Sequence, residues 1–256
     1  MQEQETTAQA PGAEPGLQED MGSVQRLIGV VLEPGKTFAA IARRPTFLLA
    51  MVASIIVSVA AAGFMYSRID MVQVMETQLR NSPAGQRMTS DEIRQQVETI
   101  TNSPFYKVML WVGPILANPI MMVALAGILM LMVYLGGSET TFLKMLGVTS
   151  HALFFMGLVG GVLMVLVILL APDPQSIDIQ NPLYTNLGHL ADPRESPILN
   201  RLLTSLDIIS FYVIYLLGLG VSKISSRMSV SKGVLLVAVP WLVYVGIAVL
   251  WRALVG

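Results

Sequence analysis

Long apolar stretches separated by polar segments are the main pattern of this chain. Each stretch approaches or exceeds the ~20 helical residues that cross a hydrocarbon core about 30 Å thick. A helix also satisfies its own backbone hydrogen bonds, as the membrane interior demands. The pattern therefore predicts an all-α polytopic membrane protein, built as a five-transmembrane-helix bundle over residues 46–255. The predicted spans cover residues 46–66, 108–135, 150–171, 205–222 and 233–251.

The polar segment between the first two spans, residues 67–103, carries two helical signatures. Thr89 and Glu92 have the form of a capping box in front of a second helix. Residues 81–85, Asn-Ser-Pro-Ala-Gly, read as a turn between the two helices. We therefore expect an extracytoplasmic helical hairpin outside the bilayer. The apolar residues at helical spacing are Ile69, Val72, Met75 and Leu79 in the first half and Ile93, Val97 and Ile100 in the second.

The residues before the first span divide into a tail and an amphipathic segment. Residues 1–22 are acidic and polar, without the basic and apolar regions of a signal peptide, and predict a disordered acidic tail. Residues 23–45 include a short predicted helix with Phe38 and Ile41 on one side and Arg43 near its end. This pattern favours an interfacial amphipathic segment in the membrane plane. A plain solvated linker is the alternative.

Composition supports the membrane assignment and excludes several kinds of chemistry. Hydrophobic residues make up 54% of the chain and charged residues only 13%, about half the quarter that is usual in soluble domains. The net charge of −1 gives no general attraction to nucleic acid. There is no cysteine and there are only two histidines, so disulfides, thiolate catalysis and cysteine-ligated metals are excluded. We expect no cofactor and no nucleic-acid partner.

The basic residues near the span ends predict the orientation. With the N-terminus inside, the short connection between the last two spans carries three bases and no acid on the inner side. We therefore expect the N-terminus inside and the C-terminus outside a bacterial cytoplasmic (inner) membrane. The inner flanks then hold Arg43, Arg44, Lys144, Lys223, Arg227 and Lys232, and the outer flanks hold Arg68, Lys107, Arg201 and Arg252.

Three polar residues in or near the spans are the candidate functional positions. Asn118 lies between Pro114 and Pro119 in the second span, where it either belongs to a kinked structural helix or lines a cavity. His151 opens the third span and is read first as a hydrogen-bonded structural residue. Asp207 begins the fourth span, where it either caps the helix N-terminus or faces water.

Two further features concern packing. Gly157 and Gly161 form a Gly-x-x-x-Gly pair that predicts close helix packing or homo-oligomerisation. The polar connection after the third span contains NPLYTNLGHL, residues 181–190, which we expect on the membrane surface through its leucines.

No phosphate-binding loop, metalloprotease motif or nucleophile elbow is present in the sequence. The chain is therefore not expected to be an enzyme.

Three segments of the chain resemble the Yip1 domain family in its bacterial form. They are LEPGKTFAAIARRPTF before the first span, GGSETTFLKMLGVTSHA at the entry of the third, and the region from Ser205 to Gly233. The chain departs from the family where Phe154-Phe155 replace a frequent proline. The resemblance implies five spans and a cytosolic N-terminus. Eukaryotic members act in vesicle trafficking and bind small Rab GTPases, but this chain lacks their Asp-Leu-x-Gly-Pro segment, so that partner is not carried over.

Two functions follow from this evidence. The first is a non-enzymatic membrane scaffold or adaptor, acting on the lipid bilayer and other membrane proteins. The second is a small permease or channel subunit. A permease needs a water-accessible path past Asn118 or Asp207, whereas nearly charge-free spans argue against ion-coupled transport.

Overall fold

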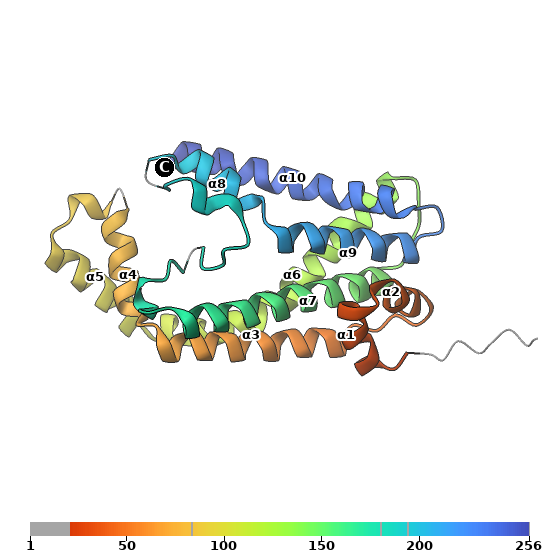
Figure 1. The fold of residues 1–256 in the computed structure, drawn as a ribbon, viewed down its shortest axis with the longest axis horizontal. Helices are drawn as coiled ribbons and strands as arrows, with labels where there is room; N and C mark the ends of the chain where they lie inside the picture. Colours follow the sequence, from red (N-terminus) through yellow and green to blue (C-terminus); the bar gives the residue numbers. More distant parts are fainter. Residues whose placement is uncertain (1–20, 83, 180, 194, 256) are drawn as a thin grey trace, which may run out of the picture.

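The computed structural model describes residues 21–82, 84–179, 181–193 and 195–255, and most of them are helical (Figure 1). The tail predicted at residues 1–22 lies outside this part of the chain, except for Met21 and Gly22. In the described residues the only β-pairing is an isolated bridge between Asn186 and Asp207. The all-α class predicted from the sequence is confirmed.

Four described helices are long and apolar enough to cross a membrane. The fourth predicted span, residues 205–222, is instead α9 (Ile208–Ile224), an apolar helix of 17 residues. At 1.5 Å per residue it is about 25 Å long, short of the roughly 30 Å hydrocarbon core. The described residues therefore contain four full-length candidate spans, where the sequence predicted five. The four long helices are α3 (Leu48–Arg68), α6 (Pro104–Leu135), α7 (Phe142–Leu170) and α10 (Val230–Val255).

Capping residues explain why α6 and α7 begin earlier than predicted. The Ser103 hydroxyl accepts a hydrogen bond from the Tyr106 N–H at 3.2 Å, so α6 starts at Pro104 rather than at residue 108. Thr141 caps α7 in the same way, and α7 starts eight residues before the predicted span. A side-chain acceptor at the N-cap satisfies a free N–H of the first turn and favours helix initiation there.

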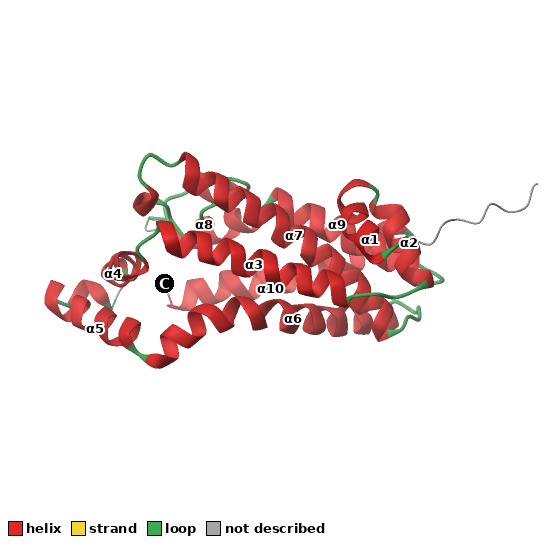
Figure 2. Cartoon of the chain, turned by 90° about the horizontal axis from the view of Figure 1, so that it is seen from below, coloured by secondary structure: helices red, strands yellow, loops and turns green. Residues whose placement is uncertain are grey.

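The short helix α9 forms the centre of the bundle. It packs between α10 on one side and α2 and α7 on the other, with its apolar residues buried on several sides. Figure 2 shows α3, α6, α7 and α10 running along the same long direction. The largest fully buried side chains of the core include Phe38, Ile41, Met122, Leu129, Met145, Val148, Leu216 and Val221.

The amphipathic segment before the first span forms two helices, α1 (Ser23–Leu32) and α2 (Pro34–Arg43). Phe38 and Ile41 of α2 are fully buried against the bundle, so this apolar face packs on protein. The outer side of α1 carries an exposed apolar stripe of Val24, Ile28, Val31 and Leu32.

The polar segment after α3 forms the predicted hairpin, which extends beyond one end of the bundle (Figure 1). It consists of α4 (Met71–Asn81), a 3-10 turn (Gly85–Arg87) and α5 (Ser90–Asn102). The predicted capping box is confirmed by two reciprocal hydrogen bonds. The Glu92 N–H donates to the Thr89 hydroxyl, and the Thr89 N–H donates to the Glu92 carboxylate at 2.7 Å. Ile93 and Val97 are buried, as their spacing predicts, whereas Ile100 is 39% exposed.

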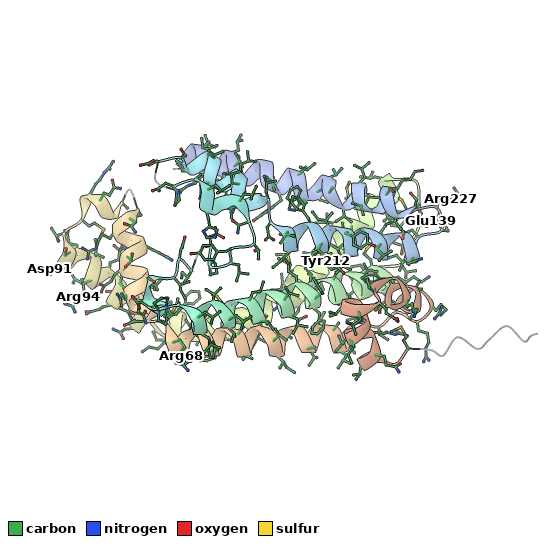
Figure 3. The ribbon with its side chains drawn as sticks, in the orientation of Figure 1. Arg68, Asp91, Arg94, Glu139, Tyr212 and Arg227 are labelled. Carbon is green, nitrogen blue, oxygen red and sulfur yellow. The ribbon has the colours of Figure 1, made fainter. Side chains whose placement is uncertain are left out.

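The connection from α7 to α9 consists of irregular chain and short helices. It contains η2 (Pro174–Ser176), η3 (Leu187–Leu190) and α8 (Pro197–Ser205), and α8 packs beside α10. The labelled charged residues gather at the two ends of the molecule, with Glu139 and Arg227 at one end and Arg68, Asp91 and Arg94 at the other (Figure 3). This distribution fits an integral membrane protein whose middle faces lipid.

Candidate functional site

Asn118 links two helices of the bundle. Its side-chain amide donates to the Ser58 hydroxyl at 2.6 Å, joining α6 to α3, and also approaches the Pro114 carbonyl at 3.4 Å. Helix α6 continues through both internal prolines. The geometry places this amide in a helix-packing contact.

His151 is buried within α7, with 2% of its surface exposed. Its Nδ1 lies 2.8 Å from the Gly147 carbonyl, so the ring donates to the backbone one turn earlier in the helix. The carbonyl accepts only, which fixes the proton on Nδ1. The ring therefore has a structural hydrogen bond within its own helix.

Asp207 is the N-cap of α9. One carboxylate oxygen, Oδ2, accepts from the Ser210 N–H at 2.8 Å and from the Ser210 hydroxyl at 2.7 Å. The negative charge lies at the helix N-terminus, where the helix dipole favours it. The bridge to Asn186 and the hydrogen bond from the Ile208 N–H to the Thr185 carbonyl join this cap to the preceding connection.

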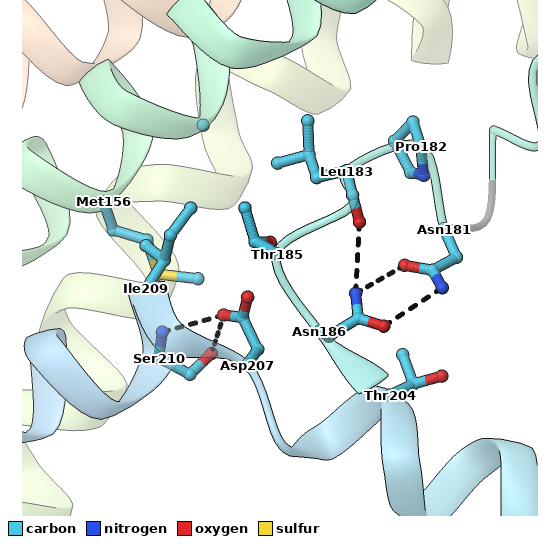
Figure 4. Close-up of a pocket in the computed structure, with 11 residues that line it drawn as sticks. Met156, Asn181, Pro182, Leu183, Thr185, Asn186, Thr204, Asp207, Ile209 and Ser210 are labelled. Atoms are coloured by element: carbon cyan, nitrogen blue, oxygen red, sulfur yellow. Dashed lines mark hydrogen bonds between the residues drawn. The ribbon is translucent and has the colours of Figure 1, made fainter. Parts of the chain in front are cut away.

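A cavity of about 270 Å³ lies beside this cap. Part of its wall comes from α7, through Met156 (Figure 4) and through Gly160. Met156 is the middle residue of the 29-residue helix α7, about 21 Å from either end. The cavity therefore lies half-way along a membrane-spanning helix. The other lining residues are Asn181, Pro182, Leu183, Thr185, Asn186, Thr204, Asp207, Ile209 and Ser210.

Two asparagine side chains shape the connection around this cavity. The amides of Asn181 and Asn186 donate to each other, at 3.2 and 2.7 Å, and Asn186 also donates to the Leu183 carbonyl and accepts from the Gly188 N–H. Irregular backbone at membrane depth is tolerated where protein satisfies its polar groups. Here the two asparagine side chains provide hydrogen-bond partners for backbone groups of this connection.

A second cavity, of about 560 Å³, adjoins the first and shares Asn181 and Thr204 in its lining. Its lining carries charges of both signs, whereas Asp207 is the only described charged residue in the lining of the first cavity. The second cavity leads toward the end of the bundle that carries the C-terminus. Its charged and titratable residues are Asp178, His189, Asp192, Arg201 and Arg252.

Only one glycine of the predicted Gly157/Gly161 pair lies against another helix. A Cβ at Gly161 would meet Val57 and Ala61 of α3 at 3.4 and 3.6 Å, so α3 packs closely there. A Cβ at Gly157 would meet nothing within 4 Å. The two glycines therefore do not share one packing contact among the described residues.

Of the candidate positions, Asp207 lines one of the two cavities described above. The polar side chains around it, Asn181, Asn186, Thr204 and Ser210, were missed from the sequence, and Leu183 lines the cavity instead of the membrane surface. The two asparagines of NPLYTN were the available signal. Within the described residues no group of three His, Asp or Glu side chains forms a metal cluster.

Comparison with known proteins identifies the family but no individual relative. The model of the Yip1 domain matches residues 28–252, which is most of the chain. Neither the search of curated proteins nor the search of solved structures finds a match.

Proposed function

Because the chain belongs to the Yip1 domain family, we propose that it is a non-enzymatic scaffold or adaptor that organises membrane proteins within the bilayer. The observation that carries this proposal is the bond between Asn118 and Ser58. A permeation path past Asn118 requires this amide to line water. Here the amide is used to hold α6 against α3.

Two surfaces support an adaptor. The α4–α5 hairpin extends beyond the bundle and exposes polar and charged side chains, among them Asp91, Arg94 and Gln95. The exposed apolar stripe of α1 suits the interface plane of a membrane. We place the N-terminus inside and the C-terminus outside a bacterial inner membrane, and include a second copy of the chain among the partners.

The second candidate, a small permease or channel subunit, is favoured by one observation. The cavity beside Asp207 lies at the middle of α7 and adjoins a larger cavity nearer the end of the bundle. A permease requires a path for its substrate that continues from these two cavities past Val213 of α9, which is buried in this structure.

Single cysteines test the two functions, because the chain has no cysteine of its own. We expect a membrane-impermeant maleimide to label Gln95→Cys in the hairpin and to leave Asn118→Cys and Val213→Cys unlabelled. Met122→Cys, whose native side chain is fully buried, is the negative control. Labelling at both Asn118 and Val213 makes the protein a permease.

A photo-crosslinking residue tests the adaptor role directly. Placed at Gln95 in living cells, it is expected to give adducts of discrete size. The same residue at Ile247, which is 64% exposed on the apolar helix α10, serves as the lipid-facing control. If Gln95 gives no adduct beyond those of Ile247, the hairpin is not a docking surface and the adaptor proposal fails.

A further inference from the structure

One oxygen of the Asp207 carboxylate has no hydrogen-bond partner among the residues that the structure describes. Oδ2 is held by the backbone and hydroxyl of Ser210, whereas Oδ1 is buried without a donor. Figure 4 shows this second oxygen directed away from Ser210, toward the space between Thr185 and Ile209. A buried carboxylate oxygen accepts hydrogen bonds only, and leaving it without one costs free energy.

Several of the neighbouring polar side chains donate hydrogen bonds to acceptors other than Asp207. The amides of Asn181 and Asn186 pair with each other, and the Thr204 hydroxyl donates to the Asn200 carbonyl at 2.8 Å. The Ser210 hydroxyl already donates to Oδ2. Among the described lining residues, Oδ1 of Asp207 is therefore the buried side-chain acceptor that has no donor.

The charge of the lining indicates a cation as that molecule. Among the described residues, Asp207 is the only charged one that lines this cavity, and no described basic residue in the lining balances it. A carboxylate at membrane depth is strongly stabilised by a positive partner. A hard metal ion requires about six or more oxygen ligands, and one free carboxylate oxygen does not supply them. A primary ammonium group needs only a good acceptor.

The walls of the cavity indicate what carries the ammonium group. Met156, Leu183 and Ile209 are apolar, and Gly160 adds room because a Cβ there would meet nothing within 4 Å. We propose that this cavity binds the primary ammonium headgroup of a membrane amphiphile, with an ammonium N–H donating to Oδ1 of Asp207. The adjoining cavity that shares Asn181 and Thr204 gives the headgroup its route from the end of the bundle. The proposal goes beyond the scaffold role and does not depend on it.

Lipid titration of the purified full chain in detergent, followed by native mass spectrometry, tests this site. The probes are phosphatidylethanolamine, whose ammonium carries N–H groups, and phosphatidylcholine, whose quaternary ammonium has none. We expect the ethanolamine lipid to bind at least tenfold more tightly than the choline lipid. Asp207→Asn, which keeps a good N-cap residue, is expected to remove this preference.

Asp70 provides a matched control. It caps α4 as Asp207 caps α9, accepting from the N–H groups of Val72 and Gln73, but lies in the hairpin away from the cavity. Asp70→Asn is expected to keep the lipid preference. Gly160→Leu, which fills the cavity without touching the carboxylate, is expected to abolish it.

Free ethanolamine distinguishes the two sources of the ammonium group. Competition that depends on Asp207 and needs no lipid chain assigns the site to soluble amines. A preference for the ethanolamine lipid without such competition assigns it to a membrane lipid. Equal binding of the two lipids by the native chain, with no ethanolamine competition, overturns the proposal. Undiminished binding by Asp207→Asn, or equal loss in Asp70→Asn, also overturns it.

Discussion

At the α1–α2 end of the bundle the helices approach one another closely, whereas at the opposite end a connection of loops and short helices occupies the space beyond α9 (Figure 1). At the first end, a Cβ on Gly218 would lie 2.5 Å from backbone atoms of Val234 in α10. Gly220 lies as closely against Val148 of α7. At the second end, the space beside Asp207 is a cavity.

The length of α9 accounts for the difference. Its 17 residues reach from the packed end only to Asp207, half-way along α7. Beyond that point irregular chain takes the place of helix, and its polar groups must find partners inside the protein. The molecule thus has one end built for rigid packing and one end built from groups that are able to rearrange around a ligand.

Filling the close contact between α9 and α10 is expected to have the largest effect. Gly218→Leu places a side chain against the backbone of α10, which cannot move as a flexible side chain does. We expect a loss of more than about 3 kcal/mol of stability, or no folded protein. Thermal unfolding followed by tryptophan fluorescence measures it. Gly157→Leu, at a position open to 4 Å, is the matched control and is expected to unfold like the native chain.

The opposite result would remove the distinction between the two ends. If Gly218→Leu has the same unfolding temperature as the native chain, α9 and α10 can separate without loss of stability. The packed end is then not rigid. If Gly157→Leu unfolds early as well, close packing extends along α7 toward the cavity.

Arg26 is expected to have the next largest effect, because it joins α1 to the start of α3. It is 3% exposed and donates to the Arg44 carbonyl at 2.6 Å and to the Thr46 hydroxyl at 2.8 Å. Arg26→Met keeps most of the volume but leaves these acceptors unpaired, at a cost of about 2 kcal/mol. Lys36→Met removes only an exposed ion pair with Glu33, worth less than about 1 kcal/mol. Equal unfolding temperatures of the two variants would show that Arg26 does not anchor α1.

The sequence predicted well wherever a local signal decides the structure. Apolar runs marked the four long helices, and the Thr89–Glu92 spacing marked the start of α5. The fourth predicted span, residues 205–222, starts before Asp207. The helix α9 instead runs from Ile208 to Ile224, because Asp207 caps its first turn.

The candidate site was predicted only in part for a different reason. Asp207 carries its own helix-cap signal, but Asn181, Asn186 and Thr204 reach the cavity through the path of a long connection. Such contacts depend on tertiary structure and leave no periodic pattern in the chain. Likewise, nothing local distinguishes Gly161, which contacts α3, from Gly157, which faces open space.

The hairpin at the loosely built end is expected to respond to acid without disturbing the packed end. The Thr89 N–H and hydroxyl donate to the Glu92 carboxylate and hold its pKa below the usual value. A carboxyl with a lowered pKa in the folded state stabilises at neutral pH, and this contribution is lost as pH falls through that pKa. Between about pH 5 and pH 3 we expect faster amide exchange in α5, while α9 stays protected. Thr89→Ala, which costs about 1 kcal/mol of capping, is expected to show the faster exchange already at neutral pH. Acid-induced exchange of equal size in α9 would mean that both ends unfold together, so that the hairpin is not an independent unit of stability.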